Sequence, residues 1–573
     1  MKQLMLGNAA VARGLYEAGC SVASSYPGTP STEITEEAAK YDAIYCEWAP
    51  NEKVAMETAF GACLAGKRSF CGMKHVGLNV AADPLFTISY TGVNAGMVIA
   101  VADDAGMHSS QNEQDSRHYA IAAKVPMLEP SDSAEALAFA KRAYEISEEF
   151  DTPVILKMCT RVSHSQSLVE LGERTEVEKP YEKNIAKYVM MPGNAIRRHP
   201  VVEERTRKLT EFAETCDLNR VEMGGTSMGV ITSSTSYQYV KEVFGDSVSV
   251  LKLGMVNPLP VKLILDFASK VDKLVVVEEL DSVIEDHCRK LGLKVWGKNV
   301  LPLEGEFSQN LVASKLGGTV HTGKTLEDAI PPRPPVMCAG CPHRGLFYTL
   351  NKNKCTVLGD IGCYTLGAVA PLSAMDMTLC MGGSISGIHG FNKARGEETE
   401  GKTVAVIGDS TFMHSGMTGL ANIAYNQSNS TVIILDNSIT GMTGHQQNPT
   451  TGPAGKIDLE SLCKAMGFNR VRVVDPYDLK ACDQAVKEEL AANEPSVIIS
   501  RRPCALLKYV KHNAPLKVNK DKCIGCKSCM KIGCPAISIK EGKAWVDNTL
   551  CVGCGVCEQL CPVGAFESTG KEG

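Results

Sequence analysis

Eight cysteines near the C-terminus constrain this chain more than any other feature of its sequence. They form two runs of similar spacing, each closed by a Cys-Pro pair: Cys523-x2-Cys526-x2-Cys529-x4-Cys534-Pro535 and Cys551-x2-Cys554-x2-Cys557-x3-Cys561-Pro562. This spacing is typical of segments that ligate two [4Fe–4S] clusters, in which three thiolates of a run hold one cube and the fourth thiolate holds the other. We therefore predict one cluster on Cys523, Cys526, Cys529 and Cys561, and a second on Cys551, Cys554, Cys557 and Cys534.

The first run is one residue longer than the usual pattern, and we expect a small bulge that shifts Cys534 without changing its role. Zinc knuckles or a disulfide framework are the alternatives, but they would need four-ligand sets without a crossed Cys-Pro partner. The sequence thus predicts a ferredoxin-like domain that moves electrons one at a time.

Composition narrows the class of protein further. The formal net charge of the 573 residues is −6 with no long basic run, which argues against nucleic-acid binding. No apolar run approaches the roughly 18 residues that span a bilayer, so we expect no membrane segment. Arg13 and Glu17 lie where a signal peptide would need its apolar core. Twenty-three cysteines then favour metal ligation in a reducing cytoplasm, and oxygen-labile clusters favour an anaerobic setting.

Alternating strand-like and helix-like segments precede the cysteine runs and predict an α/β fold with parallel sheets. Apolar runs such as GMVIAVADD, KTVAVIG and STVIILDN indicate buried strands. We predict three α/β domains, over residues 1–165, 225–330 and 331–510, with a charged linker or excursion over 166–224 between the first two. The small two-cluster domain occupies residues 511–573.

Two polar turns in the third α/β domain predict a magnesium–diphosphate site. Gly408-Asp409-Ser410 directly follows one apolar strand, and Asp436-Asn437 follows the next. Parallel strand ends would present Asp409 and Asn437 as hard oxygen ligands for Mg²⁺. Glycine at position 408 is expected to allow a sharp turn. The alternative is an ordinary strand-to-helix turn with an aspartate cap.

This pair of turns resembles the GDG…NN motif of thiamine diphosphate enzymes, with Ser410 in place of the second glycine. The resemblance implies a third magnesium ligand in the backbone carbonyl of Ile439. It also implies that the segment over residues 441–452, with Thr443 and Gly444, lines the cofactor.

Thiamine diphosphate enzymes also use a pyrimidine-binding domain that supplies a glutamate to the cofactor. Asn51-Glu52 opens a glycine- and alanine-rich helix in the first α/β domain and resembles that element, so Glu52 is our candidate and Glu57 the fallback. The alternative is a helix-start glutamate that only favours the helix dipole. The domain over 225–330 resembles the C-terminal domain of transketolase-like enzymes and carries no clear catalytic group.

Further segments resemble the 2-oxoacid:ferredoxin oxidoreductase family, specifically alpha subunits of its indolepyruvate type. These segments are Tyr26-Pro27-Gly28-Thr29-Pro30, KHVGLNVAADP (74–84), DDAGMHSSQNEQDSR (103–117) and CAGCPHRG (338–345). The resemblance as a whole extends over essentially the entire chain and is weakest in the linker or excursion. The resemblance implies that Thr29 and Arg117 hold the carboxylate of a 2-oxo acid, Arg117 by bidentate pairing. A surface salt bridge is the alternative for Arg117.

Four scattered cysteines match the order of the proximal-cluster ligands of pyruvate:ferredoxin oxidoreductase. They are Cys338, Cys341, Cys363 and Cys504. This resemblance implies a third [4Fe–4S] cluster beside the thiamine diphosphate, and the alternative is a set of buried structural thiols.

The function implied by the resemblance is oxidative decarboxylation of aryl 2-oxo acids such as indolepyruvate. Coenzyme A would take the acyl group, CO2 would leave, and electrons would pass through the clusters to an external ferredoxin. A separate beta subunit is expected, in an α2β2 assembly. Three alternatives stay open: another 2-oxo acid, a non-redox thiamine diphosphate decarboxylase or carboligase, and a ferredoxin-like electron carrier that only docks a partner.

Several other motifs give little evidence of function. Residues 396–403 match the P-loop pattern, but the strand follows the loop and three glutamates lie inside it, so we discount ATP binding. The glycine-rich segment over 381–390 lacks the pattern for a dinucleotide. His343, His414 and His445 are each a possible site residue or a structural histidine. Glu278-Glu279 indicates a cap or an interface rather than an acid–base pair.

Overall fold

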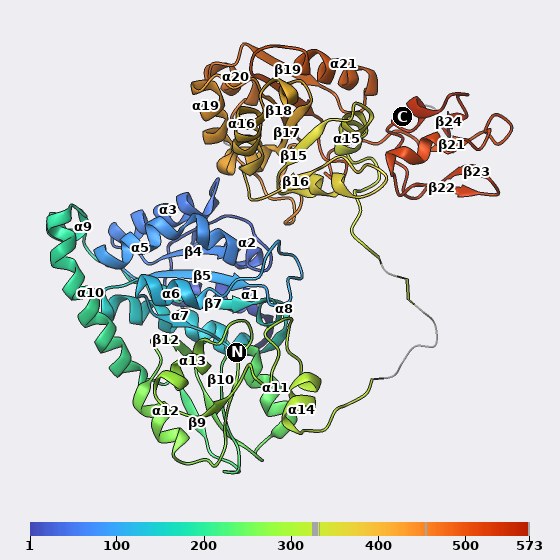
Figure 1. The fold of residues 1–573 in the computed structure, drawn as a ribbon. Helices are drawn as coiled ribbons and strands as arrows, with labels where there is room; N and C mark the ends of the chain where they lie inside the picture. Colours follow the sequence, from blue (N-terminus) through green and yellow to red (C-terminus); the bar gives the residue numbers. More distant parts are fainter. Residues whose placement is uncertain (324–329, 332, 453–454, 571–573) are drawn as a thin grey trace. The chain divides into compact units, whose positions relative to one another are not determined.

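The computed structural model describes residues 1–323, 330–331, 333–452 and 455–570. The chain divides into two compact units, Met1–Glu327 and Asp328–Gly573. Figure 1 shows that both units contain helices and strands. Among the described residues, no helix is both long enough and apolar enough to span a membrane.

The first unit is built on a seven-stranded sheet. Its strands are β2 (Val22–Ser25), β3 (Tyr45–Trp48), β4 (Ser69–Lys74), β5 (Met97–Asp103), β6 (Met127–Leu128), β7 (Val154–Cys159) and β12 (Met255–Asn257). Their order is β12-β6-β7-β5-β4-β2-β3, and all neighbours are parallel except β12 and β6. A parallel sheet has to be covered on both faces, which explains why β4 and β5 are buried along their whole length.

Helices cover the two faces of this sheet. They are α1 (Gly7–Glu17), α2 (Thr32–Ala38), α3 (Glu52–Leu64), α4 (His75–Val80), α5 (Ala82–Thr91), α6 (Arg117–Ala123), α7 (Ser133–Phe150) and α8 (Thr160–His164). Alternate residues of β5 point to opposite faces: Val98 and Ala100 pack with α1, α2 and α7, whereas Ile99 and Val101 pack with α3, α5 and α6. Each face therefore has its own apolar core.

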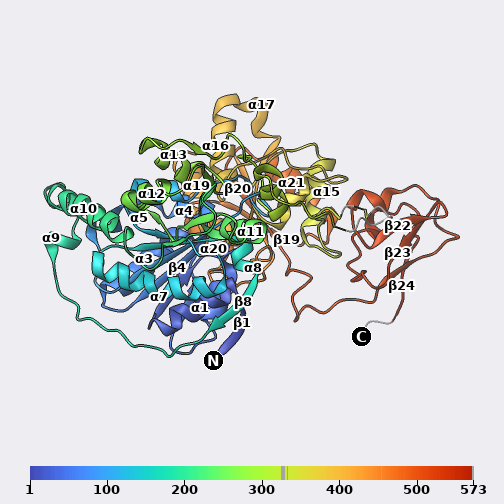
Figure 2. The ribbon, with the colours of Figure 1, turned by 90° about the horizontal axis from the view of Figure 1, so that it is seen from below.

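The charged stretch after residue 165 is ordered, so it is an excursion of the first unit and not a linker. Its elements are β8 (Gln166–Glu170), which pairs antiparallel with β1 (Lys2–Leu6), then α9 (Ile185–Tyr188) and α10 (Pro192–Ala213). Figure 2 shows the chain crossing from β8 to α9, and Figure 1 shows α10 along the side of the unit. Val202, Arg205, Leu209 and Ala213 form its buried stripe.

The middle α/β segment forms a second sheet in the same unit. Its strands are β9 (Arg220–Glu222), β10 (Gly229–Thr232), β11 (Ser249–Lys252), β13 (Leu274–Val277) and β14 (Val295–Trp296), and its helices are α11 (Ser234–Phe244), α12 (Val261–Ala268), α13 (Val283–Lys290) and α14 (Gln309–Leu316). The order is β14-β13-β10-β11-β9, with only β9 antiparallel. Because β12 of this segment pairs with β6 of the first sheet, the two α/β regions share one unit.

The second unit begins with a six-stranded parallel sheet. Its strands are β15 (Thr356–Gly359), β16 (Met377–Thr378), β17 (Thr403–Gly408), β18 (Thr431–Asp436), β19 (Arg470–Val474) and β20 (Ser496–Arg501). The order is β16-β15-β17-β18-β20-β19. Its helices are α15 (His343–Lys352), α16 (Gly383–Arg395), α17 (Glu397–Glu400), α18 (Asp409–Thr411), α19 (Met417–Tyr425), α20 (Leu459–Ala465) and α21 (Leu479–Leu490), with a 3-10 turn η1 (Cys363–Ala368) and a π-helical turn η2 (Phe412–Gly416). Residues on one face pack with α15 and α21, and those on the other with α16, α19 and α20.

A small cysteine-rich module completes the second unit. It contains two antiparallel ribbons, β21 (Leu516–Val518) with β24 (Phe566–Ser568) and β22 (Ile537–Lys540) with β23 (Lys543–Val546), and two 3-10 turns, η3 (Ser528–Ile532) and η4 (Glu558–Leu560). Its core includes Leu479 of α21 and also packs against Tyr348 and Tyr477. The predicted α/β architecture with parallel sheets and a small C-terminal cysteine-rich module is confirmed.

Candidate active site and iron–sulfur centres

The buried carboxylate of Asp409 lies at the carboxyl end of β17. Gly408 pairs with Leu435 of the neighbouring strand β18, so Asp409 and Asp436 leave the sheet side by side. Asp409 is 2% exposed, and its Oδ1 accepts a hydrogen bond from the Ser410 backbone N–H (2.8 Å). Its Oδ2 has no hydrogen-bond partner among the residues that the structure describes. Burial and the neighbouring Asp436 raise the pKa of Asp409 to about 7.

Such a carboxylate fits a bound cation. An unpaired buried carboxylate oxygen is costly, and a hard divalent ion would remove the cost. The side chain of Asn437, 8% exposed, and the carbonyl of Ile439 belong to the turn after β18, and Asn437 Oδ1 accepts from the Ile439 N–H (3.3 Å). The donor set expected for Mg²⁺ and a diphosphate is therefore gathered at one edge of the sheet.

Two details of this turn differ from the sequence-based expectation or refine it. Gly408 has an extended φ of −77°, so its glycine is not needed for a sharp turn; instead, an added Cβ would lie 2.7 Å from the ring of Tyr364. Ser410, which replaces a glycine of the motif, accepts a hydrogen bond from the Thr440 hydroxyl (3.0 Å). Both residues fix the shape of the turn.

The loop after β18 also lines this edge. The Thr443 hydroxyl donates to Gln446 (2.6 Å), and Gly444 has a φ of 124° that suits glycine. The backbone carbonyl of Asn437 accepts a hydrogen bond from the N–H of Cys504 (2.9 Å). The candidate magnesium site thus touches one of the four scattered cysteines.

In the first unit, Glu52 occupies the buried first turn of α3. The side chain that caps the helix is Asn51, which accepts a hydrogen bond from the Val54 N–H (2.9 Å), and Glu52 is the acidic residue of the first turn. Glu52 is 5% exposed and packs against Gly77 of α4, where an added Cβ would lie 2.5 Å from its Oε1. The fallback residue Glu57 is exposed and paired with Lys53.

Thr29 lies at the same edge of the first sheet, where β2 ends. It is half-buried in a turn with a cis Thr29–Pro30 bond. Gly28 packs on Lys74 at the end of β4, and Lys74, buried, donates to the Ser109 carbonyl (2.8 Å). Parallel α/β sheets bind ligands at this carboxyl edge. Lys74 was missed by sequence reasoning, although it stands directly at the end of an apolar strand.

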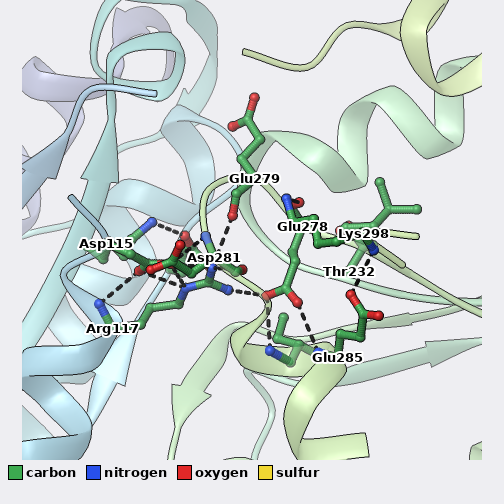
Figure 3. A network of polar contacts seen from close by, with 12 residues as sticks. Asp115, Arg117, Thr232, Glu278, Glu279, Asp281, Glu285 and Lys298 are labelled. Carbon is green, nitrogen blue, oxygen red and sulfur yellow. Dashed lines mark hydrogen bonds and ion pairs between the residues drawn. The ribbon is translucent and has the colours of Figure 1, made fainter. Parts of the chain in front are cut away.

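Arg117 is a buried ion-pair residue and does not face an open carboxylate site in this structure (Figure 3). Its Nε donates to both carboxylate oxygens of Asp115 (2.9 and 3.0 Å), and its Nη1 donates to Glu278. Its Nη2 donates to the backbone carbonyls of Glu279 (3.0 Å) and Asp281 (2.9 Å). The salt-bridge alternative therefore describes this residue, although the bridge is buried and not at the surface.

The Arg117 network joins the two sheets of the first unit. Burial raises the pKa of Asp115, but the Arg117 charge outweighs it and holds this pKa well below its ordinary range. Glu278 also accepts from the N–H groups of Ile284 (3.0 Å) and Glu285 (2.9 Å) at the start of α13. Glu278 is thus both a helix cap and an interface residue, as the sequence indicated.

The four scattered cysteines come together in the second unit. Cys338 and Cys341 share one turn, in which the Cys341 N–H donates to the Cys338 carbonyl (3.1 Å). Cys504 and Cys363 both lie beside the loop after β18: the Cys504 N–H donates to the Asn437 carbonyl (2.9 Å), and the Cys363 sulfur is 3.7 Å from where a Cβ at Gly441 would be. Burial raises the pKa of Cys363, and Cys504 and Cys338 raise it further, which agrees with their being neighbours.

The cysteines of the first predicted set lie around one small cavity in the module. Its lining includes Cys523, Cys526, Cys529 and Cys561. Burial raises the pKa of Cys557, with further contributions from Cys554, Cys534 and Cys551, the other members of the second set, and from Cys529 of the first. The two sets are therefore neighbours.

Among the described residues, no three cysteine sulfurs lie within 4.8 Å of one another.

The three histidines left open by the sequence differ in their surroundings. Burial alone lowers the pKa of His343 to about 4, and its ring lies edge-on to Tyr364, which indicates a structural role. Nδ1 of His414 lies 2.7 Å from the Ser415 hydroxyl in η2. Nε2 of His445 lies 4.0 Å from the sulfur of Cys504, so His445 flanks the four-cysteine site.

Three family models match the chain in the order that the structure shows. Residues 13–218 match "Pyruvate flavodoxin/ferredoxin oxidoreductase, thiamine diP-bdg", 360–500 match "Thiamine pyrophosphate enzyme, C-terminal TPP binding domain", and 544–567 match "4Fe-4S binding domain". Together with the buried carboxylate site and the cysteine sets, they define a thiamine diphosphate-dependent 2-oxoacid:ferredoxin oxidoreductase.

Curated relatives narrow this class. "Indolepyruvate oxidoreductase subunit IorA" of Pyrococcus horikoshii is 41% identical over 100% of this chain and 97% of its own length, and that of Archaeoglobus fulgidus is 40% identical over 98% and 96%. The chain belongs to the IorA family of indolepyruvate oxidoreductase subunits.

More distant relatives match part of the chain. "2-oxoglutarate synthase subunit KorA" of Archaeoglobus fulgidus is 25% identical and covers 53% of this chain and 99% of its own length. A structure of the 2-oxoglutarate:ferredoxin oxidoreductase from Magnetococcus marinus, 17% identical, covers 55% of this chain and 65% of its own with a TM-score of 0.47.

Proposed function

We propose that this chain oxidatively decarboxylates aryl 2-oxo acids such as indolepyruvate, with coenzyme A as acyl acceptor and an external ferredoxin as electron acceptor. The overall reaction converts one 2-oxo acid anion and one coenzyme A to one acyl-CoA, one CO2 and one proton, and it reduces two ferredoxins by one electron each. The substrate follows the name of the full-length relatives and the electron acceptor that of the family model, whereas coenzyme A as acyl acceptor follows the family resemblance of the sequence.

One contact carries the redox part of this proposal. Asn437, a candidate magnesium ligand, accepts a hydrogen bond through its backbone carbonyl from Cys504, a candidate cluster ligand. Gly441 of the same loop lies beside Cys363, whose sulfur is 3.7 Å from where a Cβ at 441 would be. The cofactor loop and the four-cysteine site are therefore neighbours, an arrangement that a non-redox decarboxylase or carboligase would not need.

Thiamine diphosphate would supply the carbanion chemistry that lets a 2-oxo acid lose CO2. Asp409, Asn437 and the carbonyl of Ile439 would hold the magnesium ion and so fix the diphosphate. Glu52 would hold a proton at the aminopyrimidine ring, because its buried carboxylate belongs to the domain that binds this ring in the family. Thr29, at the same edge of the first sheet, would contact the substrate carboxylate.

The cysteine sets would carry the electrons away from the cofactor. Cys338, Cys341, Cys363 and Cys504 would bind a proximal cluster. The next cluster would be the one on Cys534, Cys551, Cys554 and Cys557, because Gly340 packs on Val552 so closely that an added Cβ would lie 2.2 Å from it. The cluster on Cys523, Cys526, Cys529 and Cys561 would be outermost and would pass electrons to ferredoxin.

We also propose a separate beta subunit in an α2β2 assembly. The relatives are named as subunits. The excursion also exposes apolar side chains in and around α9 and α10: Tyr181, Ile185, Val189, Met191, Ile196 and Val201. Native mass spectrometry of the co-expressed subunits tests this assembly. We expect a complex with the mass of two copies of each subunit. A monomer of this chain in the presence of its partner would contradict the proposal.

Anaerobic assays of the chain with its partner test the function. Viologen dye reduction should require coenzyme A and should be fastest with indolepyruvate among aryl, branched and small 2-oxo acids. Cys363→Ser should release CO2 without dye reduction, whereas Cys463→Ser, which alters a buried thiol of α20 outside the cysteine sets, should keep both activities. CO2 release without dye reduction in the wild type would favour the non-redox alternative. No turnover, with no binding of thiamine diphosphate, would favour the electron-carrier alternative.

A further inference from the structure

Arg344 joins the two cysteine-bearing parts of the second unit. It is the second residue of α15 and is 4% exposed. On one side its guanidinium donates to the backbone carbonyls of Met337 and Cys338. On the other side it donates to the carbonyls of Ile532 (3.2 Å) and Gly533 in the cysteine-rich module. A single side chain therefore connects the loop of the proximal set to the segment before Cys534.

No carboxylate pairs with Arg344 in the described part of the chain, which is unusual for a buried arginine. Burial lowers its pKa, and the groups that oppose this effect are four thiols, Cys534, Cys341, Cys338 and Cys554. Two of these belong to the proximal set and two to the neighbouring set in the module. The positive charge thus lies between two candidate clusters.

Tyr477 strengthens the same junction. Its hydroxyl donates to the carbonyl of Gly340 between Cys338 and Cys341. Burial raises its pKa, and Cys554 contributes as well, so this ring also lies near both sets. Gln559 of the module donates to the Tyr477 carbonyl (2.7 Å). The junction is therefore held by several specific hydrogen bonds.

We propose that Arg344 is a positioning residue that fixes the distance between these two clusters and raises the reduction potential of both. Each cube with its four thiolates is anionic and gains a further negative charge on reduction. A buried cation next to it stabilises the reduced form, and net charge and hydrogen bonding are known to set cluster potentials. The inference rests on the cluster assignments proposed above.

Anaerobic redox titration followed by electron paramagnetic resonance tests this proposal on the holo-chain, without turnover. In Arg344→Met, the midpoint potentials of two of the three clusters should become more negative by at least a tenfold change in the reduction equilibrium, about 59 mV for one electron. The outermost cluster should change less. Arg344→Lys keeps the charge and should restore the potentials, while the magnetic interaction between the two clusters should weaken, because a lysine cannot reach four carbonyls.

Arg470→Met is a matched control, since it removes an arginine charge that Glu489 already neutralises. Full iron content with unchanged potentials in Arg344→Met would overturn the proposal. If Arg344→Met loses its clusters, the midpoint potentials of Arg344→Lys test the charge effect. Potentials equal to those of the wild type would support it. Potentials shifted as far as predicted for the loss of the charge would refute it. About eight irons per wild-type chain, two cubes of four, would mean that the proximal cluster is absent, which overturns the inference separately from the enzymatic assay.

Discussion

Replacing Gly77 with alanine should disable Glu52 without unfolding the chain. The added Cβ would lie 2.5 Å from Oε1, 2.6 Å from Cγ and 2.7 Å from Cδ of Glu52, whereas ordinary contact begins at 3.4 Å. The carboxylate must therefore move by about 1 Å, and a displacement of that size can cost about a hundredfold in rate. This corresponds to about 2.7 kcal/mol of transition-state stabilisation.

Stability should respond differently from rate. Gly77 lies inside helix α4, where alanine is favoured over glycine by roughly 0.5–1 kcal/mol, which offsets part of the steric cost. We expect kcat for coenzyme A-dependent dye reduction to fall about a hundredfold while the melting temperature changes little.

Gly61→Ala is the matched control, because Gly61 lies in α3 and an added Cβ there meets nothing within 4 Å. This variant should keep full activity and gain about 0.5–1 kcal/mol of stability. If Gly77→Ala keeps the wild-type kcat while Glu52→Gln loses it, the displacement argument is wrong. If both variants keep it, Glu52 does not act on the cofactor.

Four further outcomes are expected. Asp409→Asn should abolish the thermal stabilisation by thiamine diphosphate with Mg²⁺, yet the apo chain should melt no lower, because a buried charge is removed; retained stabilisation would contradict the ligand assignment. Arg117→Met should lower the free energy of unfolding in urea by about 3–5 kcal/mol, since it leaves buried carboxylates unpaired. A raised KM for 2-oxo acids at unchanged stability would instead show that Arg117 binds the substrate. Cys561→Ala should remove the electron paramagnetic resonance signal of the cluster that Cys523, Cys526 and Cys529 hold. Cys534→Ala should remove that of the cluster on Cys551, Cys554 and Cys557. If each run held its own cluster, the two variants would have the opposite effects. The last outcome concerns Glu17. Burial alone would raise the pKa of this carboxyl group, but hydrogen bonds from Lys141 and Arg13 lower it below its ordinary 4.5. Its contribution is therefore present above pH 4.5 and lost on acidification, so between about pH 5.5 and 3.5 the urea midpoint should fall more in the wild type than in Glu17→Gln.

Much of the iron–sulfur and cofactor chemistry was accessible from the sequence, because it depends on local spacing. The cysteine runs fix which thiols can share a cube, and the polar residues after two apolar strands fix where Asp409 and Asn437 meet. Parallel strands place such residues at one edge wherever the sheet forms.

The tertiary environment of individual side chains could not be predicted from the sequence in the same way. Arg117 looks like an available cation in the sequence, and only the fold brings Glu278, 161 residues away in the chain, to it. Helix α10 was hidden because charged residues surround its narrow buried stripe, which begins at Val202. The role of Gly408 also depends on a ring, that of Tyr364, which lies over forty residues away in the sequence.

The crossed cysteine sets have a consequence for how the chain matures. If Cys561 completes the cube that Cys523 begins, as proposed above, that cube lacks its fourth ligand until the second cysteine run has been synthesised. Cys504 would likewise complete the proposed set that begins at Cys338. On these assignments each site stays incomplete until the later segment has left the ribosome, and cluster insertion finishes only then. Metal loading thereby becomes a late step that reports whether the module has closed correctly.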